Sequence, residues 1–202
     1  GREAAYQMRV LVGCEFSGTV RDAFIRRGHD AMSCDLLPTE RPGPHFQGDV
    51  LSILGDGWDL AVFHPPCTYL TVSGNKWMKP EYRDRFPDRP RQREEAVEFF
   101  MALANAPIPR IAIENPIGIM STRWRKPDQV VQPWMFGHGE VKATCLWLEG
   151  LAPLAPTSVV DGRHPRMHTL PPGKDRWKER SRTYPGIAEA MAEQWGGRGP
   201  CE

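Results

Sequence analysis

The sequence alternates between short apolar runs and segments whose apolar residues recur at helical spacing. Residues 8–13, 30–34 and 59–63 are compact runs of β-branched and other apolar residues, and each predicts a buried strand. Residues 19–27 lie between the first two runs and predict a helix that ends at Gly28. The order strand, helix, strand indicates a parallel sheet.

The second half of the chain continues this alternation. Residues 93–104 predict a helix with an apolar face, and residues 186–195 predict a last helix. Residues 110–113 and 142–148 predict further strands. We therefore expect an α/β fold of the Rossmann-like type, with a mostly parallel sheet and helices on both faces.

Two segments break the pattern and concentrate positive charge. Residues 76–93 and 163–182 are rich in lysine, arginine and proline, and we expect irregular loops there. Such charge runs are either solvated surface or phosphate-binding surface. We expect one domain over residues 8–202, with basic loops at 76–93 and 151–183. Residues 1–7 precede Met8, and we expect them to be an added remnant.

Composition narrows the classes of function. The chain has 202 residues, 40% of them hydrophobic, which suits one core, and its net charge of +1 leaves nucleic-acid binding to local basic patches. The five cysteines show no C-x-x-C pair, which argues against a zinc site and against a disulfide framework. No apolar run is long enough to span a bilayer. We expect no metal and no membrane partner, and a cytoplasmic location in a bacterium or a phage-infected host.

Polar or reactive residues follow several of the predicted strands. The carboxyl ends of parallel strands meet at one edge, so Glu15, Asp35, Cys67 and Glu114 are expected to converge there. A glycine-containing turn with an acid about 20 residues further on suits a nucleoside cofactor. The turn ending at Gly18 and the later Asp35 have this spacing, although an ordinary first turn of an α/β protein fits it as well.

The run His64-Pro65-Pro66-Cys67 is the most informative motif. Prolines cannot continue a central strand, so the chain leaves the sheet there and places Cys67 on a rigid rim. A thiolate at such a rim can attack an electrophilic ring carbon. The alternative is a buried structural cysteine.

Together these motifs resemble those of the cytosine carbon-5 DNA methyltransferases. The resemblance covers most of residues 8–148 and follows the family's order: Glu15-Phe16-Ser17-Gly18, Asp35, Gly48-Asp49-Val50, Pro65-Pro66-Cys67 followed by Ser73-Gly74, and Glu114-Asn115-Pro116. It implies the S-adenosylmethionine-dependent methyltransferase fold, with S-adenosyl-L-methionine as the cofactor.

The resemblance also implies roles for individual residues. Cys67 would add to carbon 6 of cytosine, and Glu114 would hold or protonate ring nitrogen 3. We expect three catalytic residues: Cys67, Glu114 and Lys142. We expect these cofactor-binding residues: Glu15, Phe16, Ser17, Gly18, Asp35, Asp49 and Pro65. We expect these substrate-binding residues: Pro66, Ser73, Asn115, Lys76, Arg83 and Arg166.

The chain departs from the family in its last third. On one strand the family has a glutamine and two arginines where this chain has Glu140, Lys142 and Thr144, and residues 149–185 leave little room for a target recognition domain. We expect duplex DNA with a flipped cytosine as the partner. The alternatives are a methyltransferase acting on a cytosine nucleotide or on RNA, and a catalytically inactive nucleic-acid-binding relative.

Overall fold

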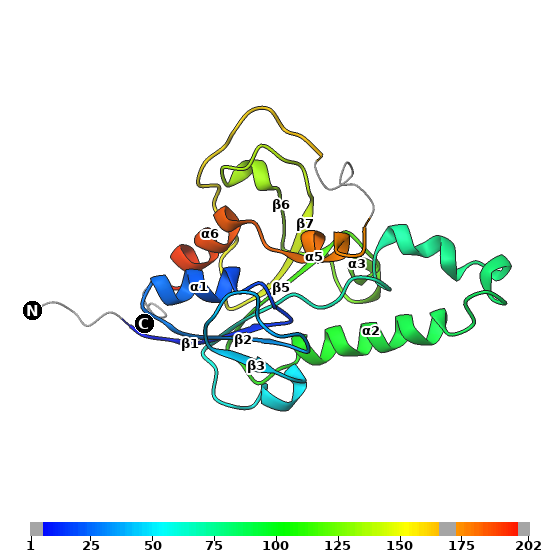
Figure 1. The fold of residues 1–202 in the computed structure, drawn as a ribbon, viewed down its shortest axis with the longest axis horizontal. Helices are drawn as coiled ribbons and strands as arrows, with labels where there is room; N and C mark the ends of the chain where they lie inside the picture. The colour runs from blue at the N-terminus through cyan, green and yellow to red at the C-terminus, as the bar shows by residue number, and fades with distance from the viewer. Residues whose placement is uncertain (1–5, 166–172, 198–202) are drawn as a thin grey trace, which may run out of the picture.

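The computed structural model describes residues 6–165 and 173–197, without the side chains of residues 72 and 73. Within these ranges the chain forms one seven-stranded sheet in the order β3-β2-β1-β4-β5-β7-β6 (Figure 1). The strands are β1 (Arg9–Gly13), β2 (Asp30–Asp35), β3 (His45–Gln47), β4 (Leu60–Phe63), β5 (Arg110–Pro116), β6 (Gln129–Val131) and β7 (Thr144–Glu149). Neighbours from β3 to β5 pair in parallel, whereas β7 runs antiparallel to β5 and β6.

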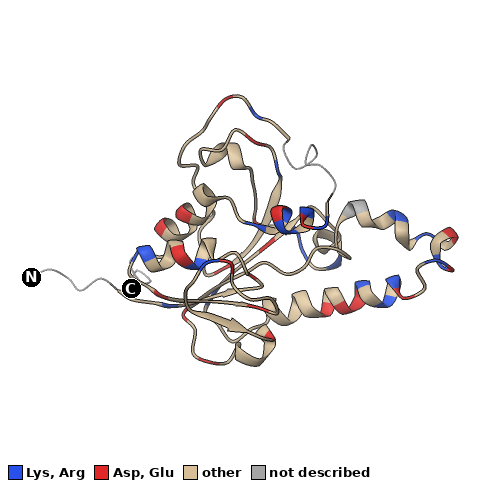
Figure 2. Ribbon diagram, in the orientation of Figure 1, with Lys and Arg blue, Asp and Glu red and all other residues tan. Residues whose placement is uncertain are grey.

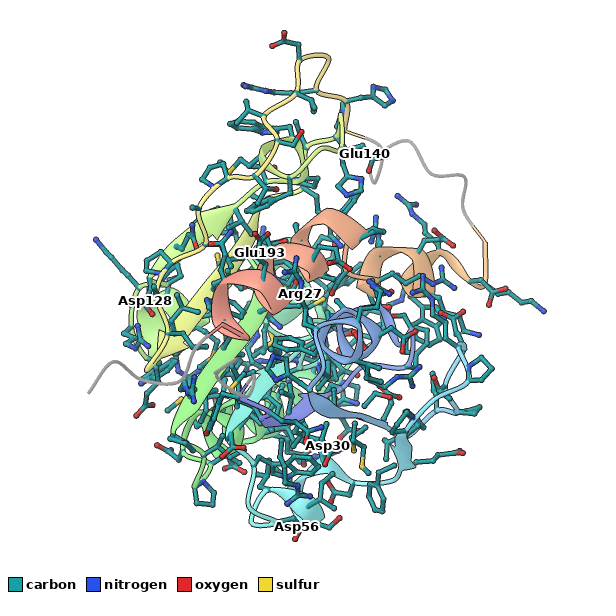
Figure 3. All side chains as sticks on the ribbon, turned by 90° about the vertical axis from the view of Figure 1, so that its left-hand side faces the viewer. Arg27, Asp30, Asp56, Asp128, Glu140 and Glu193 are labelled. Atoms are coloured by element: carbon teal, nitrogen blue, oxygen red, sulfur yellow. The ribbon has the colours of Figure 1, made fainter. Side chains whose placement is uncertain are left out.

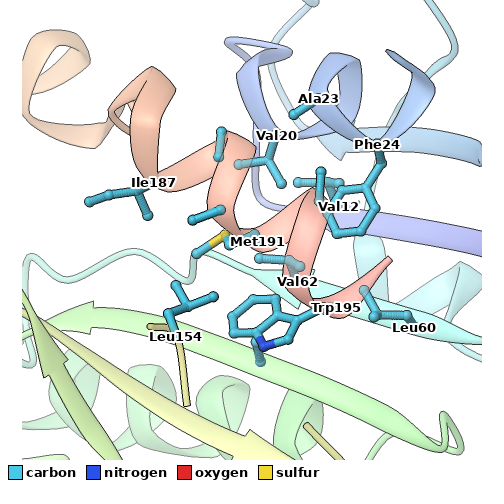
Figure 4. Close-up of a cluster of buried hydrophobic side chains, with 14 of the residues drawn as sticks. Val12, Val20, Ala23, Phe24, Leu60, Val62, Leu154, Ile187, Met191 and Trp195 are labelled. Atoms are coloured by element: carbon cyan, nitrogen blue, oxygen red, sulfur yellow. The ribbon is translucent and has the colours of Figure 1, made fainter. Parts of the chain in front are cut away.

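One face of the sheet is covered by helices α1 (Thr19–Arg26) and α6 (Pro185–Trp195). Figure 4 shows the apolar cluster between them and the sheet, where Val12 and Val62 meet Phe24 and Met191, all buried. Arg27 and Glu193 lie next to each other at the edge of this layer, 3.8 Å apart (Figure 3). The last helix therefore closes the core over the first.

The opposite face is covered by helix α2 (Arg89–Ala104), together with the short helices η1 (Val50–Ile53) and α3 (Met120–Arg123). The buried Phe100 of α2 packs edge-on against Trp147 of β7, with ring centroids 5.3 Å apart. Since both faces carry helices, the central strands β1 and β4 are buried on both sides, as their continuous apolar runs predict.

Two segments lie outside the layers. The basic arm, which we define as residues 72–88, contains η2 (Val72–Met78) and η3 (Pro80–Tyr82) and extends away from the sheet beside the start of α2 (Figure 1). Charged residues of both signs occupy it (Figure 2). Residues 132–143, with η4 (Pro133–Met135), and residues 150–165 form an excursion before and after β7, with Glu140 in its first limb (Figure 3).

The predicted α/β class is confirmed, and the differences are local. Helix α2 begins at Arg89 rather than at residue 93, since Pro90 is tolerated in the first turn of a helix. Strands β3 and β6 were not expected, because three residues are too few to show a period. The stretch 163–182 is partly helical, since α5 (Arg176–Ser181) forms within it. No helix in the described ranges is long and apolar enough to cross a membrane.

Candidate functional site

Cys67 and Glu114 lie at the same edge of the sheet, after the neighbouring strands β4 and β5. The parallel register pairs Phe63 with Ile113, which brings the next residues, His64 and Glu114, side by side. After His64 the two prolines take the chain out of the sheet. The structure therefore places Cys67 beside the carboxyl end of β5, where the sequence predicted it.

Two tethers hold the loop that carries Cys67. The buried Asn115 donates from Nδ2 to the carbonyl oxygen of Pro65 at 2.8 Å. Further along the loop, the amide of Ile119 donates to the carbonyl oxygen of Leu70 at 2.8 Å. Asn115 thus acts on the loop backbone, and Pro66 stands exposed next to Cys67.

His64 and Glu114 form a hydrogen-bonded ion pair in which Nδ1 donates to Oε2. Their side chains are only 9% and 17% exposed. Burial lowers the pKa of His64, but the neighbouring carboxylate of Glu114 outweighs burial and holds this pKa above its ordinary value. Burial raises the pKa of Glu114, but the His64 cation outweighs it and holds that pKa below its ordinary value. Both shifts favour the charged forms of the pair, an imidazolium and a carboxylate.

The Cys67 thiol is half-buried and lies outside both hydrophobic clusters of the core. Burial raises its pKa, the charge of Glu114 raises it further, and Lys142 and Arg180 oppose these effects. The resting group at neutral pH is therefore the thiol rather than the thiolate. A reaction that uses this sulfur needs its proton to leave when the substrate arrives.

Lys142 faces the same edge from the segment before β7. It lines a hollow with Glu114, Thr144, Thr183 and Tyr184. Its Nζ donates to the carbonyl oxygen of Arg180 and lies 5.9 Å from the centre of the Tyr184 ring. The Glu140 carboxylate accepts a hydrogen bond from the Tyr184 hydroxyl. The structure thus brings Lys142, Cys67 and Glu114 together.

A second hollow lies on the other side of His64, at the turn after β1. Its lining consists of Cys14, Glu15, Phe16, Ser17, His64, Ser181 and Thr183. The Glu15 carboxylate accepts from the amides of Val20 and Arg21, at 3.0 and 3.1 Å, so it holds the start of α1. The predicted cofactor turn therefore borders a hollow, although the Glu15 side chain is engaged by the helix.

Gly18 and the two acids complete this side of the edge. Gly18 has a φ of +79°, and a Cβ there would lie 2.6 Å from the Arg21 guanidinium, so the turn requires glycine. Asp35 accepts from the amide of Leu37 at 2.8 Å and Asp49 from that of Leu51 at 3.0 Å, which fixes both carboxylates. Burial raises the pKa of Cys14, and the charges of both acids raise it further. The acids and the turn thus share one region.

Residues 173–184, which we call the strap, cover this region. The sequence predicted a basic loop over most of the strap, either solvated or phosphate-binding, but no role beside the cofactor turn. Trp177 lies against Phe16, with ring centroids 5.8 Å apart. Arg182 binds both carboxylate oxygens of Glu40, at 2.9 and 2.7 Å. Thr183 lines both hollows. The strap's sequence is basic and proline-flanked, so no period in it signals a role at the site.

The predicted substrate residues on the basic arm lie away from the edge. Lys76 and Arg83 are exposed, and Lys76 lies over the Trp77 ring at 4.6 Å. Trp77 packs edge-on against Tyr82 and Phe86, at 5.1 Å from each, so these rings form the arm's own small core rather than free stacking surfaces. The Ser73 side chain and Arg166 lie outside what the structure describes.

His64 is the site residue that the sequence interpretation passed over. It directly precedes the Pro-Pro-Cys motif, and the sequence predicted no role for it. Its position was available from the pattern, because it follows a buried strand just as Glu15 and Glu114 do. Within the described ranges, no group of three or more His, Cys, Asp or Glu side chains could hold a metal ion.

The fold of this chain is similar to that of two solved structures described here. No family model matches the chain, and no curated protein does. A prophage-encoded E. coli protein, described as a DNA modification methyltransferase, matches with a TM-score of 0.46 and 15% identity, over 77% of this chain and 52% of that one. A DNMT2 mutant from Spodoptera frugiperda matches with a TM-score of 0.43 and 13% identity, over 79% of this chain and 55% of that one. The chain is structurally similar to both at low identity, and it spans about half of their length.

Proposed function

We propose that this protein transfers a methyl group from S-adenosyl-L-methionine to carbon 5 of cytosine in DNA. The observation that carries the proposal is the convergence of a thiol, a carboxylate and an ammonium group at one edge of the sheet, from Cys67, Glu114 and Lys142. These are the groups that a pyrimidine ring needs around it if it is to be activated by addition.

The residues around the second hollow fit the cofactor. Asp35 suits the ribose hydroxyls, Asp49 suits the adenine amine, and Phe16 supplies an apolar wall. Ser17 lines the same hollow, Pro65 directly follows His64, which also lines it, and the turn at Gly18 lets the backbone approach closely. When bound, S-adenosyl-L-methionine supplies an electrophilic methyl group.

Cys67 and Glu114 divide the activation of the ring between them. The S–H bond of Cys67 breaks and its proton passes to solvent as the sulfur forms a bond to carbon 6, and the electron pair displaced from the ring's carbon 5–carbon 6 double bond raises the electron density at carbon 5. Glu114 neutralises the negative charge that develops at nitrogen 3. Lys142 is placed to bind the ring carbonyl or a phosphate. Once carbon 5 has been methylated and its proton lost, elimination frees Cys67.

DNA is the substrate that the exposed surface favours. The basic arm presents Lys76 and Arg83 on a projecting segment, which suits a phosphate backbone better than a single nucleotide. A base in a duplex must be flipped out to reach a half-buried thiol. Flipping costs free energy because the base loses its pairing and stacking, and a mismatched base loses less. RNA, a free cytosine nucleotide and an inactive binding protein are the competing possibilities.

The test is covalent trapping with a duplex that contains 5-fluorocytosine, in the presence of S-adenosyl-L-methionine. Fluorine cannot leave as a cation, so an active enzyme stays attached to its substrate. We expect a denaturation-resistant adduct with the native chain and none with Cys67→Ser. Cys145→Ala, which removes a buried sulfur on β7, is the matched control and should still form the adduct.

The same assay separates the competing functions. An adduct with fluorinated RNA or nucleotide but none with DNA would replace DNA as the substrate. Cofactor and DNA binding without an adduct on any acceptor would establish the inactive relative and overturn the proposal. An adduct that survives Cys67→Ser would remove the assigned nucleophile.

A further inference from the structure

Three ionisable side chains form a buried row across the edge of the sheet. Glu15, His64 and Glu114 belong to the carboxyl ends of β1, β4 and β5, which are neighbours in the sheet. The amide of His64 donates to the carbonyl oxygen of Gly13 at 3.0 Å, which fixes the middle member. His64 thus stands between the cofactor hollow and the carboxylate assigned to the cytosine.

This row contains one proton that the reaction needs. Nitrogen 3 of neutral cytosine carries a lone pair, so an ionised Glu114 facing it would repel the ring rather than assist it. The proton that Glu114 lacks is on its neighbour, because His64 donates Nδ1–H to Oε2 of the carboxylate. An acid catalyst is therefore stored as an ion pair.

We propose that His64 is the positioning residue that supplies Glu114 with the proton used at cytosine nitrogen 3, an inference that rests on the proposed function. In the step, the Nδ1–H bond of His64 breaks and an O–H bond forms on Glu114, which leaves a neutral imidazole and a carboxylic acid. The acid then gives that proton to nitrogen 3 as the Cys67 sulfur adds to carbon 6. The transfer from His64 to Glu114 leaves the pair neutral overall. Once the acid has given its proton to nitrogen 3, the pair is a neutral imidazole and a carboxylate, and the proton offsets the negative charge that the sulfur brings to the ring.

The surroundings of His64 fit both states of the ring. Nε2 is buried and has no hydrogen-bond partner among the described residues, and His64 lines the hollow that also contains the hydroxyls of Ser17, Ser181 and Thr183. The neutral ring keeps its hydrogen on Nε2, so this nitrogen is a donor in both states. Glu15 favours the charged ring and Lys142 disfavours it.

Variation of pH tests the transfer in the trapping assay. His64→Asn keeps an N–H that can donate to Glu114 but has no proton to give, so Glu114 must take its proton from solvent. We expect adduct formation by this variant to be slower than in the native chain by on the order of a hundredfold at about pH 8, with the gap narrowing toward about pH 6. A merely structural role for His64 would slow the reaction by the same factor at every pH, and this result would overturn the inference.

The charge of the ring gives a second readout that does not depend on rate. We expect the ¹⁵N signals of His64, assigned by their loss in His64→Asn, to report an imidazolium in the free protein and a neutral ring in the trapped adduct. An adduct in which His64 stays charged overturns the inference but leaves the proposed function intact. Failure of the native chain to form any adduct is instead a failure of the proposed function, and the two results are distinct.

Discussion

The edge of the sheet and the basic arm are built on opposite principles. At the edge, Asn115 is buried and hydrogen-bonded, and Glu114 and His64 neutralise each other. On the arm, exposed cations surround three packed aromatic rings, and Lys76 is held by a ring rather than by an acid. The rigid region holds the groups that must meet at fixed distances, and the exposed region holds groups that need only approach a charged surface.

This contrast predicts different consequences of substitution in the two regions. Changes at the edge should alter rates, thiol chemistry and stability, because each side chain there has a partner that is left unsatisfied. Changes on the arm should alter affinity and its dependence on salt, with chemistry preserved once the substrate is bound.

The largest effect is expected from Glu114→Gln. The amide cannot supply the proton or balance the charge of His64, so methyl transfer should fall by about 10²- to 10⁴-fold. The same variant should make Cys67 more reactive toward iodoacetamide at neutral pH, because the carboxylate that helps to raise the pKa of Cys67 is gone. Alkylation rates measured across pH by mass spectrometry check this.

The alkylation rate of Cys67 in the native chain is the reference for this variant. A raised pKa of Cys67 means little thiolate at neutral pH, so native alkylation should be slow there and increase as pH rises. Lys142→Met should shift the increase to higher pH, because Lys142 opposes the raised pKa. Identical alkylation curves for all three proteins would show that the edge is not electrostatically coupled.

The next effect is expected from Asn115→Ala. This change removes the hydrogen bond to Pro65 and leaves a buried carbonyl oxygen without its donor, at a cost of about 1–3 kcal/mol of unfolding free energy. It should also slow trapping of 5-fluorocytosine, because the loop that carries Cys67 loses a tether. Thermal unfolding and trapping should both change, whereas an unchanged trapping rate would show that the loop is held elsewhere.

The sequence predicts the edge well because strand ends follow from the pattern. Buried parallel strands read as apolar runs, and the residue after each run is at the same edge, so Glu15, Asp35 and Glu114 could be placed without coordinates. Cys67 could be placed because prolines end a strand. The pairing of His64 with Glu114 could not, because it depends on the register between two strands that are distant in sequence.

The strap and the basic arm show where the pattern fails. Nothing periodic in residues 173–184 announces that Trp177 contacts Phe16 or that Arg182 reaches Glu40, since both are contacts between irregular segments. On the arm, nothing in the sequence shows that Trp77 packs against Tyr82 and Phe86. Local contacts of exposed segments have no signature that a single sequence can show.

Replacing both Lys76 and Arg83 with glutamine tests whether the basic arm binds DNA. If each contacts one phosphate, the slope of log affinity against log salt for duplex DNA should become less steep by about 0.9 per contact. Methyl transfer at saturating DNA should stay close to native, because neither residue is near the edge. Glu81→Gln with Asp84→Asn, on the same arm, is the matched control and should strengthen binding. A fall in the saturated rate would place the arm within the chemistry.

The smallest effect is expected where the two kinds of region meet, at the ion pair between Arg182 of the strap and Glu40. The pair is partly exposed, so a double-mutant cycle with Arg182→Gln and Glu40→Gln should give a coupling of about 0.2–1 kcal/mol in unfolding free energy. Arg182 holds the pKa of Glu40 below its ordinary value, so this stabilisation is present at neutral pH and is lost as pH falls through that lowered value. Ser181 and Thr183 line the cofactor hollow, so loss of the ion pair should also weaken S-adenosyl-L-methionine binding. The loss of affinity should be only a few-fold, because the free energy of the ion pair is no larger than this coupling. Calorimetric titration of both single variants measures this, and a much larger loss would mean that the strap belongs with the rigid edge rather than with the adaptable surface.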